Sequence, residues 1–191
     1  MPVRTALIAG LVLLLATCYL AAEEPQDTLS PETEALETQD DWVAFKSPER
    51  GFTVSFPEEP KTTATPVEGM NPLTQYSFEV SLGDDIVYNV VVFEYSDGKG
   101  PNPPDAGYYN KVMKAYAKGS GSRLRKKGPA TIGDHSGYEA TATDTKRKLY
   151  YLIDIVPDGD RVYLLVSGGP RGHATSDEAK RFRDSFRILE D

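Results

Sequence analysis

The chain has 191 residues, of which 39% are hydrophobic and 26% charged, the balance expected of a globular protein with a core. Its 11 Tyr and 7 Phe exclude a largely disordered chain. The formal charge of −8 is carried mainly by residues 23–41, so the remainder is close to neutral and a nucleic-acid-binding protein is not expected.

Residues 1–22 are predicted to be a signal segment. Arg4 precedes an apolar run over residues 6–16, which suits a signal peptide and is too short to span a bilayer. Cleavage after Ala22 is one reading, and lipidation of Cys18, whose preceding residues resemble a bacterial lipobox, is the other. We therefore expect an exported protein, periplasmic, at the cell surface or secreted, which associates with a membrane only if Cys18 is lipidated.

Residues 23–41 are predicted to be an acidic, disordered tether. This segment combines low hydrophobicity with like charge and contains no Lys or Arg, a composition that does not favour a packed core. Its acids are Glu23, Glu24, Asp27, Glu32, Glu34, Glu37, Asp40 and Asp41.

Residues 42–191 are predicted to form a single domain. Apolar and polar residues alternate over 52–56 and 76–82, a pattern that indicates half-buried strands. Residues 57–73 contain four prolines and are expected to be a loop or an irregular edge. Residues 86–95 are apolar on both faces, as in a central strand.

Two helices are expected. The first begins at Asp105, a good N-cap residue, and buries Tyr109, Val112, Met113 and Tyr116, which share one helical face. The second begins at Ser176. Further strands are expected over residues 122–127, 138–143, 149–156 and 161–167.

These elements predict an α+β fold with a largely antiparallel sheet, because several of the links are short hairpins. Since two strands are apolar on both faces, we expect helices to cover both sides of the sheet, giving an α/β/α sandwich.

Three motifs resemble those of exported bacterial domains with a PsbP/Mog-like fold. They are FxSPxxGFxVxFP at residues 45–57, GxxxGYE at 133–139 and FxDSFRI at 182–188. The resemblance covers about residues 42–191 and implies an antiparallel sheet between helices. PsbP proteins bind a membrane complex and Mog proteins a small GTPase, so it implies a binding module, although fold does not transfer function.

No motif for catalysis, metal or cofactor binding is present, and we predict no enzyme, no metal and no cofactor. His135 and His173 lack the arrangement of a nucleophile with its base, and two histidines without a cysteine beyond Cys18 do not make a zinc site. The alternative is an exported hydrolase or small-ligand enzyme that uses Asp or Glu carboxylates in a cleft, which no sequence motif would reveal.

Two groups of basic residues are the candidate binding site. If their strands are neighbours, they form one face suited to an acidic protein, an anionic surface or the chain's own tether. We therefore predict an envelope binding module with an unidentified protein or surface partner and no nucleic acid. The candidate residues are Arg123, Arg125, Lys127, Lys146, Arg147 and Lys148.

Overall fold

The computed structural model describes residues 42–66, 73–95, 100 and 105–190. The predicted signal segment, the acidic tether and Cys18 lie outside this part of the chain. In chain order the elements are β1 (Val43–Ser47), η1 (Pro48–Arg50), β2 (Phe52–Phe56), β3 (Lys61–Pro66), β4 (Leu73–Leu82), β5 (Ile86–Tyr95), α1 (Ala106–Gly119), β6 (Arg123–Ile132), β7 (His135–Asp144), β8 (Leu149–Asp158), β9 (Arg161–Gly169), η2 (His173–Thr175), α2 (Asp177–Ser185) and β10 (Arg187–Ile188).

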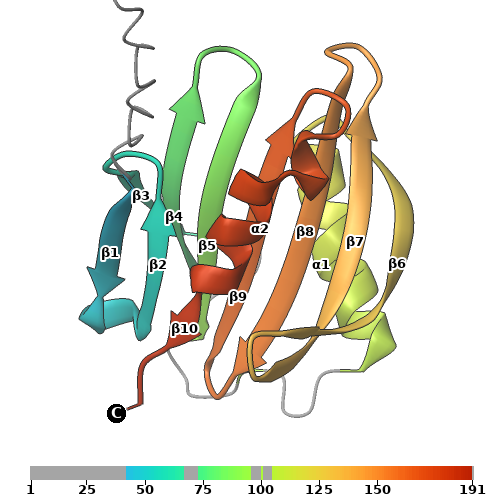
Figure 1. Cartoon of the computed structure of the whole chain (residues 1–191). Coiled ribbons are helices and arrows are strands. Elements are labelled where there is room, and N and C mark those ends of the chain that lie inside the picture. Colours follow the sequence, from blue (N-terminus) through green and yellow to red (C-terminus); the bar gives the residue numbers. More distant parts are fainter. Residues whose placement is uncertain (1–41, 67–72, 96–99, 101–104, 191) are drawn as a thin grey trace, which may run out of the picture. The chain divides into compact units, whose positions relative to one another are not determined.

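A seven-stranded sheet forms the centre of the fold, in the order β3-β4-β5-β9-β8-β7-β6 (Figure 1). Every pair of neighbouring strands in it is antiparallel. Short hairpins join β4 to β5, β6 to β7, β7 to β8 and β8 to β9. β5 pairs with β9 instead of the next strand in sequence, so the chain leaves the middle of the sheet after β5 and returns at the far edge as β6.

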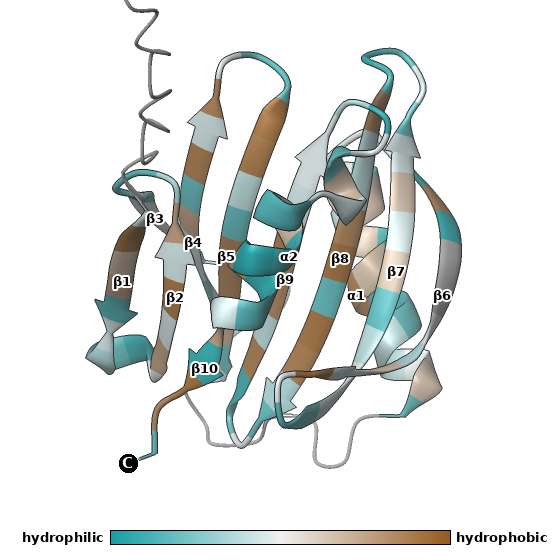
Figure 2. Ribbon diagram, in the orientation of Figure 1, coloured by the Kyte–Doolittle hydropathy of each residue, from teal (hydrophilic) through white to brown (hydrophobic). Residues whose placement is uncertain are grey.

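One face of the large sheet, called the front here, is covered by a second sheet together with α2 (Figure 1). The second sheet has the order β1-β2-β10, and β10 adds two residues to the edge of β2. Aromatic rings dominate the packing on this face, and strands coloured as hydrophobic lie beneath the largely polar outer surface of α2 (Figure 2). The fully buried aromatic side chains of this cluster are Phe52, Phe56, Tyr88, Tyr163, Phe182 and Phe186.

The opposite, back face is covered in part by α1 (Figure 1). Met113 is fully buried against this face, and Tyr109 stacks on Tyr138 of β7 with the ring centroids 4.8 Å apart. Strands β5, β8 and β9 supply the aliphatic floor of this cluster through Val91, Ile153, Ile155 and Leu164. Strands β5, β8 and β9 are thus apolar on both faces, as their sequences require.

The predicted α/β/α sandwich is wrong. The described residues contain two α-helices, and only one lies on each side of the large sheet. The front face is closed mainly by the β1-β2-β10 sheet, which packs beside α2. The reason is that β1 and β2 alternate apolar and polar residues, so they bury one face against the large sheet in the way a helix would.

The helix starts follow from their capping residues. The Asp105 side chain accepts a hydrogen bond of 2.7 Å from the backbone N–H of Tyr108, and Ser176 accepts one of 3.2 Å from the N–H of Ala179. Both satisfy amide groups that the first helical turn leaves without a partner. Residues 57–73, expected to be a loop or an irregular edge, contain β3, an exposed edge strand that follows Pro60 and ends at Pro66.

Candidate functional site

The structure brings the two predicted basic groups to the same corner of the large sheet. Arg123, at the start of β6, lies opposite Thr143, near the end of β7. The turn from β7 to β8 follows directly and carries Lys146, Arg147 and Lys148. Antiparallel pairing therefore places segments that are about twenty residues apart in sequence side by side.

Arg147 is turned away from this corner by the turn itself. The buried Asp144 carboxylate accepts backbone N–H bonds from Lys146 (2.9 Å) and Arg147 (3.1 Å), and it pairs with the Arg147 Nε at 2.7 Å. The Arg147 Nη2 also donates to the Tyr151 hydroxyl at 3.2 Å. Tyr151 packs in the core of the back face. The contacts of Arg147 therefore stabilise the turn between β7 and β8. Hydrogen bonding to Arg147 lowers the pKa of Asp144, which keeps the carboxylate ionised.

We use the name basic corner for Arg123, Arg125, Lys146 and Lys148, whose side chains are all exposed. Lys127 pairs through its backbone with Ala140 further along β6, and its side chain lies outside the described part of the structure. Four of the six predicted residues therefore form the basic corner.

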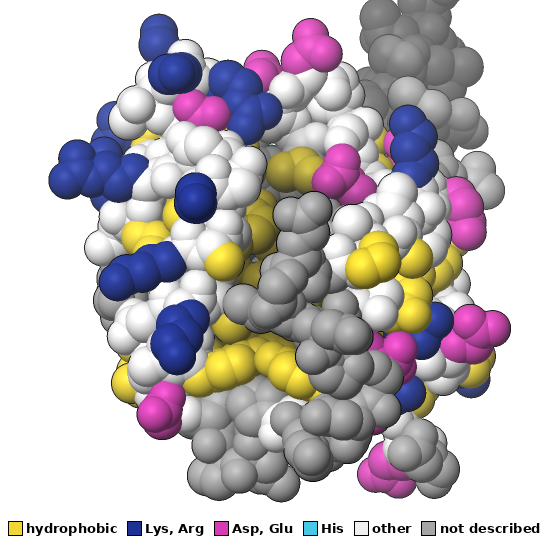
Figure 3. Space-filling model, turned by 180° about the vertical axis from the view of Figure 1, so that it is seen from behind, with side chains coloured by type: hydrophobic (Ala, Val, Ile, Leu, Met, Phe, Trp, Pro, Cys, Tyr) yellow, Lys and Arg dark blue, Asp and Glu magenta, His cyan; other side chains and the backbone are white. Residues whose placement is uncertain are grey.

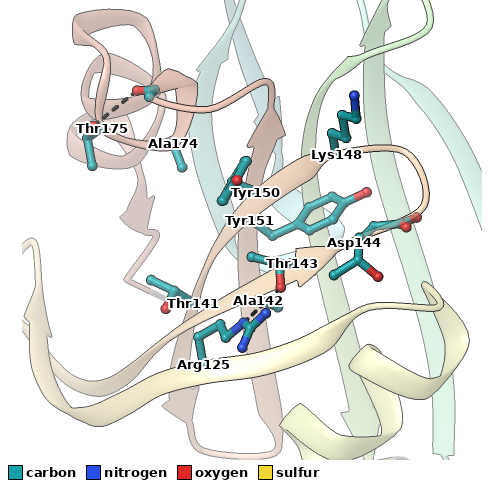
Figure 4. A pocket seen from close by; sticks show the side chains of 12 residues that line it. Arg125, Thr141, Ala142, Thr143, Asp144, Lys148, Tyr150, Tyr151, Ala174 and Thr175 are labelled. Carbon is teal, nitrogen blue, oxygen red and sulfur yellow. Dashed lines mark hydrogen bonds between the residues drawn. The ribbon is translucent and has the colours of Figure 1, made fainter.

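A hollow of about 610 Å³ opens within the basic corner (Figure 4). Arg125 and Lys148 supply its cations, and Thr141, Thr143 and Thr175 add hydroxyl-bearing side chains. The Arg125 Nε donates to the Thr143 hydroxyl at 3.0 Å, which fixes the guanidinium on the sheet beside the hollow (Figure 4). Neither Arg125 nor Lys148 forms an ion pair with another described residue.

Two local irregularities coincide at this hollow. Lys148 has φ of 59°, and it is the one non-glycine residue with positive φ in the described ranges. A backbone in this left-handed region is costly for a residue with a β-carbon, and such strain is often found at functional positions. Tyr150 is 37% exposed, the largest exposure of a big hydrophobic side chain in the described chain. The hollow thus offers two cations, hydroxyl groups and an aromatic ring, together with the Asp144 carboxylate, whose charge is matched by Arg147.

A cluster of charges that sequence reasoning missed lies further along the same face of β7 and β8. Asp154, 2% exposed, faces Glu139 in the register of these strands. Arg183 of α2 reaches both, with its Nε 2.8 Å from Asp154 Oδ2 and its Nη2 3.1 Å from Glu139 Oε2. Burial raises the pKa of Asp154 to about 7, against the opposing effect of the Arg183 charge. An acid within the apolar run 152–156 was the signal available in the sequence.

The two histidines occupy unrelated positions. His135 opens β7. The ring of His173, in η2, packs edge-on against Tyr88 with centroids 5.5 Å apart, and burial lowers its pKa. His173 is therefore held as a neutral packing residue, and the front-face core accounts for its position.

The described residues contain no group of three or more His, Cys, Asp and Glu side chains placed to hold a metal ion. Within the same part of the chain, none of the helices has the length and apolar character needed to cross a membrane.

No protein-family model and no curated protein matches the chain. Some solved structures are similar to the chain. The solution structure of cyanobacterial PsbP (CyanoP) from Synechocystis sp. PCC 6803 is similar with a TM-score of 0.54 at 12% identity, over 78% of this chain and 94% of that one. The match extends over nearly the whole of that protein, so this chain has a PsbP-like fold.

Two weaker likenesses carry no argument about this chain. A crystal structure from Bacteroides thetaiotaomicron has a TM-score of 0.43 at 14% identity, over 79% of this chain and 50% of that one. A protein of unknown function from Pseudomonas aeruginosa has a TM-score of 0.38 at 12% identity, over 73% of this chain and 90% of that one. At 12% identity the likeness to cyanobacterial PsbP defines the fold and leaves the function to be argued from the site.

Proposed function

We propose that the protein is a non-catalytic binding module that acts outside the cytoplasm and holds an acidic protein or surface through its basic corner. The observation that carries this proposal is the convergence of Arg125 and Lys148 on one hollow, with no carboxylate of the described residues paired to either. Export is part of the proposal and rests on the apolar run at residues 6–16.

The chemistry of the hollow favours an acidic ligand. A cation without a partner attracts anions over about the Debye length, and an Arg guanidinium fixed in place forms directed bonds to carboxylate or phosphate oxygens. The Thr side chains add short-range hydrogen bonding, and the exposed ring of Tyr150 adds contact area. Lys148, with its positive φ, lines the same hollow as Arg125.

The alternative of a carboxylate-dependent enzyme has one observation in its favour, the raised pKa of Asp154 beside Glu139. A general acid or base must be able to reach the proton that it transfers. Both Asp154 oxygens face Arg183 under α2, at 3.0 Å for Oδ1 and 2.8 Å for Oδ2, and the residue is 2% exposed. This arrangement supports a role in docking α2, and the enzyme remains the second candidate.

The test measures binding of the full-length protein to poly-L-glutamate by calorimetry. Replacing Arg125 and Lys148 together by Gln should weaken binding about tenfold, because two partly exposed charges contribute roughly 0.5–1 kcal/mol each. Binding should also weaken as salt rises from about 50 to about 200 mM. Lys114→Gln, an exposed lysine on α1, is the matched control and should bind as the wild type does.

Capture from the native cell envelope then identifies the partner. A stoichiometric acidic partner that is lost in the double variant and retained in Lys114→Gln supports the proposal. Equal capture by all three proteins, or equal affinity for poly-L-glutamate, would remove the basic corner as the binding site. Turnover of a substrate that is lost in Glu139→Gln would favour the enzyme.

A further inference from the structure

A second hollow lies on the back face, where α1 covers only part of the large sheet. It is a groove of about 520 Å³ between α1 and strands β4 and β5, within the size range of small-molecule sites. Figure 3, which views this face, shows hydrophobic side chains at the base of a hollow near the middle of the molecule. The groove is separate from the basic corner and shares no lining residue with the hollow there.

The floor and the helix side of the groove are apolar. Val91, 5% exposed, and Leu164, 1% exposed, form its base together with Phe93. Val112 and Ala115 of α1 line the helix side. Displacing water from such a surface favours an apolar chain or ring by about 25 cal/mol for each Å² that it covers.

The strand side of the groove is polar and carries a carboxylate. Ser77 donates to the Asn89 side-chain oxygen at 3.0 Å, and the Asn89 Nδ2 donates to Glu79 Oε2 at 3.0 Å. The Ser81 hydroxyl donates to the other Glu79 oxygen at 3.1 Å. These bonds hold the Glu79 carboxylate in place while leaving its charge without a cationic partner among the described residues.

The two ends of the groove differ in charge. At the Glu79 end lie the Tyr116 side chain and Ser120, where α1 ends and its dipole is negative. A smaller hollow continues from there toward Asp84 and Asp85. Arg147 also borders that smaller hollow, but its charge is matched by Asp144. Lys111 lies on α1 toward the opposite end, where the Tyr95 and Tyr108 hydroxyls are 3.2 Å apart.

We propose that this groove binds a small amphiphilic cation, an apolar chain or ring with one ammonium group, oriented with the ammonium beside Glu79 and the apolar part over Val91 and Phe93. The carboxylate, the negative helix end and the Tyr116 ring all favour a cation at that end. Lys111 disfavours a second cation at the other end, so the ligand has one orientation. This site goes beyond the proposed function and does not depend on it.

Two probes with the same decyl chain and head groups of opposite charge test the proposal, decyltrimethylammonium and decyl sulfate, each below its micelle concentration. Calorimetry on the full-length protein should show one site with about fivefold tighter binding of the cation. Amide chemical shifts should change in β4, β5 and α1 when the cation is added. Equal binding of the two probes, or shift changes confined to other elements, would overturn the proposal.

Two variants locate the site. Glu79→Gln keeps the shape of the side chain and one of its two accepting oxygens while removing the charge, and it should lower the affinity for the cation to that for decyl sulfate. Ala115→Trp should fill the groove and abolish binding of both probes. Lys114→Trp is its matched control, because Lys114 is the exposed neighbour on α1 that does not line the groove. Full cation binding by Ala115→Trp, with circular dichroism showing a folded protein, would contradict the assignment.

Discussion

The guanidinium of Arg183 on α2 and the carboxylate of Asp154 on β8 meet through two parallel contacts, of 2.8 Å from Nε to Oδ2 and 3.0 Å from Nη2 to Oδ1. The pair is asymmetric in burial, because the Asp154 side chain is 2% exposed and that of Arg183 is 24% exposed. Arg183 also contacts Glu139 at 3.1 Å, so one cation serves two acids. The cost of burying the ionised Asp154 carboxylate therefore exceeds the stabilisation that Arg183 gives to it.

This imbalance predicts a specific pH dependence of stability. The pKa of Asp154 rises from 3.8 to about 7 on folding, so between these values the folded state holds a proton that the unfolded state releases. The contribution of Asp154 to stability is therefore complete at low pH and is lost as the pH rises toward 7. The free energy of unfolding of the wild type, minus that of Asp154→Asn, should fall over this interval.

Urea denaturation of both proteins at a series of pH values measures this difference. Taking the difference removes the opposite trend that Asp144 and Glu178 contribute, since their pKa values are lowered. A difference that stays constant, or one that rises with pH, would show that Asp154 is ionised throughout the range.

Lys148→Gly should stabilise the fold and weaken binding at the basic corner. Lys148 adopts φ of 59°, a conformation that glycine enters without a steric penalty, so the variant should gain about 1 kcal/mol in free energy of unfolding. The lost ammonium group should lower affinity for poly-L-glutamate. Lys146→Gly, in the same turn, is the control and should not be stabilised. A destabilised Lys148→Gly would refute the strain argument.

Gly137→Ala should destabilise the protein by about 1–3 kcal/mol through overpacking. A β-carbon at this position in β7 would lie 2.7 Å from Ile132 Cδ1 and would also collide with the backbone carbonyl oxygen of Ile155. Gly128→Ala, on the neighbouring strand β6, meets nothing within 4 Å and should be close to neutral. Thermal unfolding of the two variants checks the contrast, and similar melting temperatures would count against it.

Phe182→Ala should cost about 3–5 kcal/mol, because it removes a buried ring and leaves a cavity. Phe182 is 1% exposed, and its ring lies 5.4 Å from that of Phe56 and 5.3 Å from that of Tyr88. Lys180→Ala, on the exposed side of the same helix, is the control. Guanidinium denaturation gives both values, and a cost below about 1 kcal/mol for Phe182→Ala would mean that α2 contributes little to the front core.

The elements with strong periodicity could be predicted from the sequence. The alternation over 76–82 lies within β4, and the helix expected from Asp105 is α1 with Met113 fully buried. The layer on the front face could not be predicted, because local periodicity shows that a segment buries one face without showing what it packs against. The sequence could not decide between a loop and an edge strand at β3, because Pro60 before it and Pro66 at its end indicate a break in structure that an edge strand also tolerates.

The basic corner was partly predictable. The two charged groups are evident in the sequence, and their proximity follows once β6 and β7 pair. Arg147 pairs with Asp144 and so does not join the basic corner. This pairing depends on how the Asp144 side chain closes the turn, which is a detail of local geometry. The pairing of Asp154 with Arg183 depends on the register in which α2 docks, which tertiary packing decides.

The small sheet joins the beginning of the described domain to its end. Arg187 of β10 lies opposite Thr53 of β2, and the backbone N–H of Leu189 donates to the carbonyl oxygen of Gly51 at 2.8 Å. The front core therefore cannot close until the last residues of the chain are available. Contacts of such long sequence separation slow folding, so β2 cannot complete its pairing before residues 187–189 have been synthesised.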